Sequence, residues 1–113
     1  MKPFDIQRPW GGFRQFTLNE PTTVKILRIK AGKRVSLQRH HEREEFWHII
    51  SGTGKVIVED KIIPVSQDEE ITVPTGATHR LEAGTEDLVF LEIAKGHFVE
   101  DDIERIADDY GRE

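Results

Sequence analysis

Short apolar and β-branched runs alternate along this chain with clusters of turn-forming residues. The runs cover residues 24–29, 35–37, 46–50, 55–58, 62–65, 71–73 and 88–93. The turn signals, rich in Gly, Pro, Asn, Asp and Ser, fall at 11–12, 19–21, 31–32, 51–54, 59–60, 74–76 and 83–84. Many short strands separated by regular turns are typical of an all-β sandwich or barrel. The pattern therefore predicts an all-β fold.

The last part of the chain has a different pattern. Asp101 and Asp102 are residue types that cap helices, and Ile103 and Ile106 follow them at helical spacing. Gly111 would end such a helix. We therefore expect a short C-terminal helix after the strands.

Length and composition narrow the class of protein. A chain of 113 residues is close to the usual size of one domain. Its 16 basic and 21 acidic residues give a net charge of −5 without a basic stripe, which argues against a nucleic-acid partner. The absence of cysteine excludes disulfides and thiolate zinc sites. No signal core or membrane-length apolar run is present, so we expect a cytoplasmic protein without a membrane partner.

Four polar residues interrupt the strand-like segments at positions that suit a metal site. Gln38 and His40 are two residues apart and would share one face of a strand. Glu45 follows on the next expected strand, and His79 lies on a later one. Burying these side chains without a cation or hydrogen bonds would cost several kcal/mol. This nitrogen and oxygen donor set suits Zn²⁺, Mn²⁺, Fe²⁺ or Co²⁺.

The remaining histidines have simpler interpretations. His97 has no partner at a useful spacing, so we interpret it as structural. His41 and His48 are ambiguous, because their direction depends on how regular the strands are. The large apolar residues of the segment 46–50 are expected to be core.

Two ordered motifs contain the candidate ligands together with turn residues. They comprise, in order, Gly32, Gln38, His40, Glu45 and Gly52, and then Pro74, Gly76 and His79. In order and spacing these residues resemble the two cupin motifs. Relative to those motifs, Gln38 replaces the first His of the first motif, and Asp68 replaces the leading Gly of the second. The resemblance implies a single cupin barrel, also called a double-stranded β-helix or jelly roll.

A narrower resemblance extends along nearly the whole chain. Gln38, in place of the first histidine of the motif, resembles the pattern of the mannose-6-phosphate isomerases. Further agreement lies at residues 8–11, 36–38, 40–41, 51–53, 74–82, 100–103 and 109–112. The chain resembles the type II isomerase domain, which usually follows a mannose-1-phosphate guanylyltransferase domain. We expect one cupin domain over 1–113, with an N-terminal arm at 1–20, a barrel at about 22–95 and a tail at 96–113.

This resemblance implies an activity and a cofactor. The activity would be the interconversion of mannose 6-phosphate and fructose 6-phosphate through an enediol intermediate. The cofactor would be a divalent metal ion held by Gln38, His40, Glu45 and His79. Zinc is the first expectation, and manganese, iron, cobalt and nickel remain open because this ligand set does not choose sharply among them.

Other residues receive roles only through the resemblance. Arg43 occupies the Arg of the family's His-rich motif and could act on the developing charge, or it could be a turn cation paired with nearby glutamates. The general base is open among Glu92, Glu42 and His48, of which we select Glu92. The substrate phosphate would be bound by Lys95, Arg105 and Arg112.

The chain also departs from the family pattern, at Glu42, Phe46, Ala94 and Lys95. These departures leave open a non-catalytic cupin that binds metal and a sugar or sugar phosphate. A cupin dioxygenase is a third hypothesis, and Gln38 argues against it. By analogy with other cupins, which often pair their sheets, we expect a homodimer.

Overall fold

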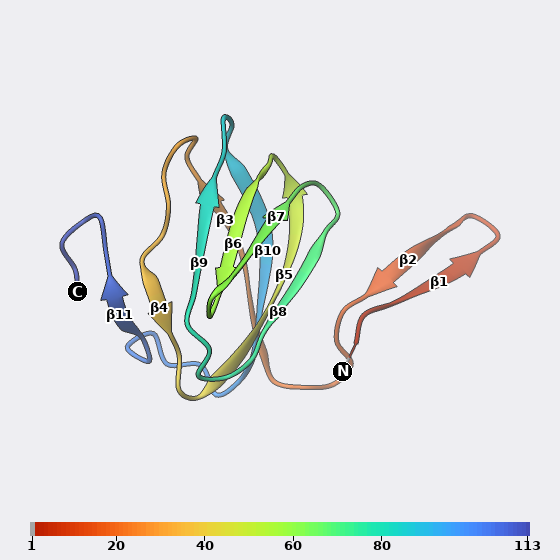
Figure 1. The fold of residues 1–113 in the computed structure, drawn as a ribbon. Helices are drawn as coiled ribbons and strands as arrows, with labels where there is room; N and C mark the ends of the chain where they lie inside the picture. The colour runs from red at the N-terminus through yellow and green to blue at the C-terminus, as the bar shows by residue number, and fades with distance from the viewer. Residues whose placement is uncertain (1) are drawn as a thin grey trace.

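The computed structural model describes residues 2–113, which form strands and turns without a helix (Figure 1). The strands are β1 (Phe4–Arg8), β2 (Gly11–Gln15), β3 (Thr22–Ile29), β4 (Leu37–Arg39), β5 (Arg43–Ser51), β6 (Gly54–Val58), β7 (Lys61–Val65), β8 (Glu70–Val73), β9 (His79–Ala83), β10 (Leu88–Gly96) and β11 (Glu104–Ala107). Since the described residues contain no helix, they contain no membrane-spanning helix. The expected all-β fold is confirmed.

Two sheets build the barrel. One has the strand order β3-β10-β5-β8 and the other the order β11-β4-β9-β6-β7, with the strand pairs antiparallel. Buried side chains from both sheets form a single core cluster, in which Trp47 and Phe90 of the first sheet join Val56 and Leu81 of the second. Strand alternation explains this, because every second residue of a half-buried strand points inward.

The inward-facing residues of β5 change in character along the strand. Ile49 and Trp47, at 0% and 1% exposure, belong to the apolar core. Glu45 and Arg43, at 2% and 7%, are equally enclosed but charged. One end of the barrel is therefore filled with hydrocarbon, and the other end encloses polar side chains.

The expected N-terminal arm contains a β-hairpin that the hydrophobic pattern did not predict. Strands β1 and β2 pair in register from Phe4↔Gln15 to Arg8↔Gly11, which leaves a two-residue turn. Figure 1 shows the hairpin standing away from the barrel. Its foot is tied to β8 by the Arg14 guanidinium, which donates to both carboxylate oxygens of Glu70 at 2.9 and 2.6 Å.

The expected C-terminal helix is wrong. Residues 104–107 instead form β11, which pairs with the short strand β4 and satisfies its open edge. Asp102 does use its carboxylate as a cap, but the groups it accepts from are the backbone N–H groups of His41 and Glu42, both at 2.9 Å. The same side-chain chemistry that caps a helix here fastens the tail to the turn between β4 and β5.

Candidate metal centre

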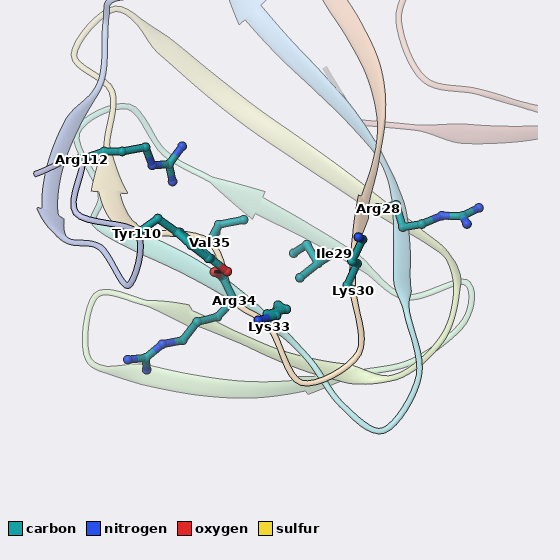
Figure 2. Close-up of a pocket in the computed structure, with 8 residues that line it drawn as sticks. All are labelled: Arg28, Ile29, Lys30, Lys33, Arg34, Val35, Tyr110 and Arg112. Atoms are coloured by element: carbon teal, nitrogen blue, oxygen red, sulfur yellow. Dashed lines mark hydrogen bonds between the residues drawn. The ribbon is translucent and has the colours of Figure 1, made fainter.

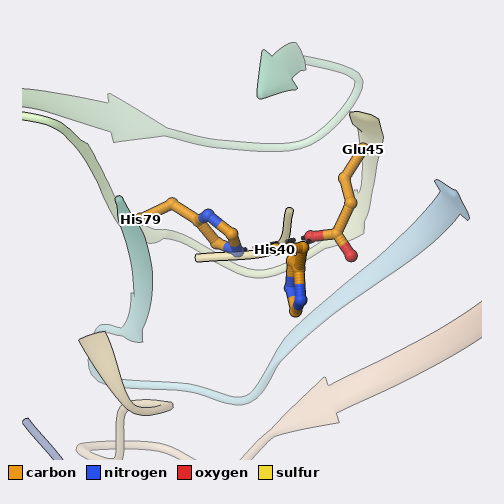
Figure 3. A group of neighbouring side chains, drawn as sticks. All are labelled: His40, Glu45 and His79. Atoms are coloured by element: carbon orange, nitrogen blue, oxygen red, sulfur yellow. Dashed lines mark ion pairs between the residues drawn. The ribbon is translucent and has the colours of Figure 1, made fainter. Parts of the chain in front are cut away.

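His40, Glu45 and His79 converge at the polar end of the barrel (Figure 3). They come from the end of β4, from β5 and from the start of β9, and each is at most 3% exposed. The Glu45 Oε1 atom lies 3.3 Å from His79 Nε2 and 3.6 Å from His40 Nε2. One potential ligand atom from each residue lies within 4.8 Å of the other two.

The backbone fixes the tautomer of both imidazoles. His40 Nδ1 lies 2.6 Å from the Asp102 carbonyl oxygen, and His79 Nδ1 lies 3.0 Å from the Ala77 carbonyl oxygen. Because a carbonyl only accepts, Nδ1 carries the proton in each ring and donates it. Both Nε2 atoms are then unprotonated; that of His79 faces Glu45, and that of His40 lies between Glu45 and the Arg43 guanidinium. Burial lowers the pKa of His40, which favours the neutral imidazole that binds metals.

These atoms fit a divalent cation. His79 Nε2 is buried and has no hydrogen-bond partner. Its lone pair faces a carboxylate oxygen, an arrangement that is repulsive unless a cation or a proton lies between them. Ligands about 2.1 Å from one metal ion stand roughly 3.0–3.4 Å apart at tetrahedral or octahedral angles. The separations to Glu45 match this range or lie slightly above it, and fixing Nδ1–H on a carbonyl is typical of metal-binding histidines.

Gln38, the fourth predicted ligand, lies beside the triad. Its backbone is in register with His79 across the β4–β9 pair, and its side chain lines the same cavity as His40 and Glu45. The Gln38 Oε1 atom accepts a hydrogen bond from Ser36 Oγ at 2.8 Å. An amide oxygen has a second lone pair, so this bond leaves one free for a cation. Coordination by Gln38 stays a prediction.

A second carboxyl group touches the triad. Glu92 of β10 is 9% exposed and shares a hydrogen bond with Glu45. Burial raises the pKa of Glu92, and the adjacent Glu45 carboxylate raises it further. Burial would also raise the pKa of Glu45, but the adjacent His79 and Glu92 side chains outweigh it and lower the pKa. One carboxylic acid and one carboxylate therefore stand side by side.

Arg43 is not a solvated turn cation. It is 7% exposed, and its guanidinium carbon lies 4.3 Å from the centre of the Phe98 ring. Nη1 donates to the Val99 carbonyl at 3.2 Å, Nη2 lies 3.3 Å from His40 Nε2, and Nε lies 3.5 Å from the Glu45 carboxylate. This is a buried cation held against two of the candidate ligands.

A cavity of about 250 Å³ opens onto this group. Its lining comprises Lys25, Leu27, Gln38, His40, Arg43, Glu45, Glu92, Glu100, Asp101, Ile103 and Arg105. Lys25 was not predicted, although its position two residues before Leu27, on the same face of β3, was an available signal. Glu100 and Asp101 were not predicted to line a site either, and Asp101 was expected to cap a helix.

The three cations predicted to bind phosphate lie in different places. Arg105 lines the cavity, and its buried Nε atom has no hydrogen-bond partner. Lys95 lies on the opposite face of β10 from Glu92, and its Nζ lies 3.9 Å from Glu44. Arg112 lines a separate pocket with Arg34 and its neighbours (Figure 2), and Asp108 holds its guanidinium at 2.9 and 3.0 Å.

Of the three candidate bases, only Glu92 is among the residues that line the cavity. Glu42 is exposed in the turn after β4. His48 lies on the opposite face of β5 from the core residue Trp47. Its Nδ1 lies 2.8 Å from Glu70, near the foot of the hairpin.

The fold and the buried ligand set define a cupin-type barrel with a candidate metal centre. The family model described as mannose-6-phosphate isomerase C-terminal matches residues 2–108, and the chain belongs to this family.

Curated relatives agree over nearly the whole chain. The alginate biosynthesis protein AlgA of Pseudomonas aeruginosa is 37% identical over 110 residues, and a mannose-1-phosphate guanylyltransferase of Escherichia coli is 38% identical over 110 residues. Each alignment covers 96% of this chain but 23% of the relative. The chain thus matches less than a quarter of each relative's length.

Solved structures show the same fold. The capsular polysaccharide assembling protein CapF of Staphylococcus aureus aligns with a TM-score of 0.69 at 24% identity, over 93% of this chain and 34% of that one. A putative sugar phosphate isomerase of Acidithiobacillus ferrooxidans aligns with a TM-score of 0.64 at 26% identity, over 74% of this chain and 55% of that one.

We expect chelator-treated protein to be stabilised by Zn²⁺ or Mn²⁺. An ion that binds only the folded state contributes about 2.7 kcal/mol at a hundred times its Kd, so thermal unfolding should shift upwards by several degrees. Glu45→Gln and His79→Ala should abolish the shift, whereas His97→Ala, at an exposed position, should retain it. An equal shift in all variants would contradict the assignment of these ligands.

The raised pKa of Glu92 predicts how the stability of metal-free protein depends on pH. Above the ordinary carboxyl value of 4.5 the unfolded chain loses this proton while the folded chain keeps it. The contribution of Glu92 to stability should therefore fall as the pH rises from 4.5 towards the raised pKa, while the lowered pKa of His40 acts in the opposite direction below 6.5. Glu92→Gln should flatten this decline, measured by urea unfolding between pH 5 and 8. A variant with the unchanged slope would show that another group causes the dependence.

Proposed function

We propose that this chain is a metal-dependent aldose–ketose isomerase that interconverts mannose 6-phosphate and fructose 6-phosphate. The observation that supports this most strongly is the buried His40–Glu45–His79 group, with Glu92 at hydrogen-bond distance from its carboxylate. Membership of the mannose-6-phosphate isomerase C-terminal family supports the choice of substrate.

Gln38, His40, Glu45 and His79 would hold the metal ion. When bound, a divalent ion would stabilise negative charge that develops on the substrate carbonyl oxygen. The protein's contribution is to keep these ligands rigid and dry. Arg43, fixed by the Phe98 ring and the Val99 carbonyl, adds a permanent positive charge at the same place.

Glu92 would move the proton. Isomerisation takes a proton from C2 of the aldose and returns one to C1, and the reverse direction exchanges these atoms. A single carboxyl group can serve both carbons if it lies beside them. Glu92 lines the cavity beside the candidate ligands, which places its carboxyl group where it could reach both carbons of a bound substrate.

Arg105 would bind the phosphate. It lies on β11 opposite Gln38 and has an unpartnered Nε atom, while Lys25 adds a second cation to the cavity lining. An arginine fork matches phosphate oxygens well. Of the three cations expected from the sequence, Arg105 has the position that suits this role.

The alternative is a cupin that binds a sugar phosphate without turning it over. The departures from the family pattern at Glu42, Phe46, Ala94 and Lys95 favoured it. None of these four is among the residues that line the cavity. Phe46 instead packs against Phe16, with ring centres 5.9 Å apart, and Lys95 approaches Glu44. The departures therefore give the alternative little support.

The decisive assay follows conversion of mannose 6-phosphate to fructose 6-phosphate by chelator-treated protein, with each divalent ion added back in turn. We expect turnover only with metal, and its loss in both Gln38→Ala and His79→Ala, with His97→Ala as control. Circular dichroism would confirm that each variant folds. Folded, metal-loaded protein that binds the sugar phosphate but never converts it would support the alternative.

The position of Arg105 gives a second prediction for this activity. Arg105→Met should raise KM by about ten- to a hundredfold with kcat nearly unchanged, because a hydrogen bond to a charged group contributes about 1.5–3 kcal/mol and this contact is present in both ground and transition states. Arg112→Met is the matched control and should leave KM unchanged. An effect confined to Arg112→Met would move the phosphate site to the other pocket.

A further inference from the structure

Arg43 shares a ligand atom with the candidate metal centre. Its Nη2 atom lies 3.3 Å from His40 Nε2. Because His40 carries its ring proton on Nδ1, held by the Asp102 carbonyl, Nε2 is the acceptor in this contact and the guanidinium N–H is the donor. An unprotonated imidazole nitrogen has a single lone pair. That lone pair accepts from Arg43 or binds a metal ion, but it cannot do both.

This competition is confined to His40. The Nε atom of Arg43 lies 3.5 Å from the Oε2 atom of Glu45. His40 and His79 approach the other oxygen of this carboxylate, Oε1. His79 Nε2 is buried without a hydrogen-bond partner. Two of the three candidate ligand atoms are thus open to an ion, and the guanidinium holds the third.

The guanidinium has other contacts that do not involve His40. Its Nη1 atom donates to the Val99 carbonyl at 3.2 Å, and its carbon lies 4.3 Å from the centre of the Phe98 ring. The same ring lies 4.7 Å from the Nζ atom of Lys25, and both cations line the cavity. Arg43 can therefore give up His40 and remain in the cavity wall, with its Nη2 N–H groups free to donate to a ligand there.

We propose that Arg43 and the metal ion compete for His40 Nε2, and that giving up this nitrogen frees the Nη2 donor of Arg43 for an oxygen of the sugar phosphate. This inference rests on the metal centre of the proposed function. In metal-free protein the guanidinium balances the charge of Glu45 and covers the lone pair of His40. In metal-loaded protein the ion takes over both tasks, and Arg43 becomes a substrate-binding group. Metal and substrate then strengthen each other's binding, and this coupling is reciprocal.

The first experiment measures the affinity of chelator-treated protein for Zn²⁺, by competition with a chelating dye at one pH. Arg39→Met is the matched control for Arg43→Met, because both remove one positive charge, and Arg39 is paired with Glu104 on the surface at 2.8 Å. We expect Arg43→Met to bind Zn²⁺ at least about tenfold more tightly than Arg39→Met, since the ion no longer displaces a charged hydrogen-bond donor. Equal or weaker binding by Arg43→Met would overturn the competition. Zn²⁺ binding by none of the proteins would instead overturn the metal centre itself.

A second measurement uses the unchanged chain, so that the folding of the variant does not affect it. It follows the exchange of arginine N–H protons with water by ¹⁵N NMR, with and without saturating Zn²⁺. Arg80 is the internal control, because it is also 7% exposed and donates to the carbonyls of Val35 and Ala107. Exchange should accelerate at Arg43 and not at Arg80. Unaltered exchange at Arg43 in Zn²⁺-saturated protein would show that the guanidinium keeps His40, against the proposal.

The release of the donor is tested with mannitol 1-phosphate, a sugar phosphate without the carbonyl group that isomerisation requires. Zn²⁺ should tighten its binding to the Arg39→Met protein about tenfold more than to the Arg43→Met protein, measured by calorimetry. The comparison does not need turnover, so it separates this proposal from the isomerase activity. An equal effect of Zn²⁺ in both variants would refute the freed donor, whether or not the chain is an isomerase.

Discussion

The buried carboxylate of Glu45 constrains the rest of this structure. A charged group taken out of water is tolerated only where other groups compensate for the lost hydration. Here an arginine lies 3.5 Å from it and a carboxylic acid shares a hydrogen bond with it, whereas the two imidazole nitrogens that approach it require a cation or a proton between them. The two imidazoles and the arginine are each held in turn by a backbone carbonyl. The geometry of the barrel end is therefore the geometry that this one charge requires.

Period-two alternation and motif spacing made the strands and the triad predictable. Ser36, Gln38 and His40 are spaced two residues apart, as residues on one face of a strand are. The turn that contains Gly76 is fixed to this segment, because the Gly76 backbone N–H donates to the His40 carbonyl at 2.8 Å. Gly76 has φ of 83°, a conformation that favours glycine. The tail was not predictable in this way. An aspartate cap followed by spaced isoleucines has the same appearance in a helix and in a loop that leads into an edge strand, and the open edge of β4 decides between them.

Position within the cavity could not be read from sequence either. Arg105 and Arg112 are seven residues apart, yet one lines the cavity of the triad and the other a separate pocket. The register of β11 against β4 separates them. Sequence identified the residue types that the chemistry needs, and sheet pairing selected which of them reach the site.

The bond between His40 and the Asp102 carbonyl spans 62 positions in the chain. Closing a loop of this length is a slow, entropically unfavourable step, and folds dominated by such distant pairings form slowly. During synthesis, His40 leaves the ribosome long before the residue that orients its ring. The ring is held in its ligand orientation only once the segment at Asp102 has docked on the turn between β4 and β5, so the shape of the ion site depends on that docking.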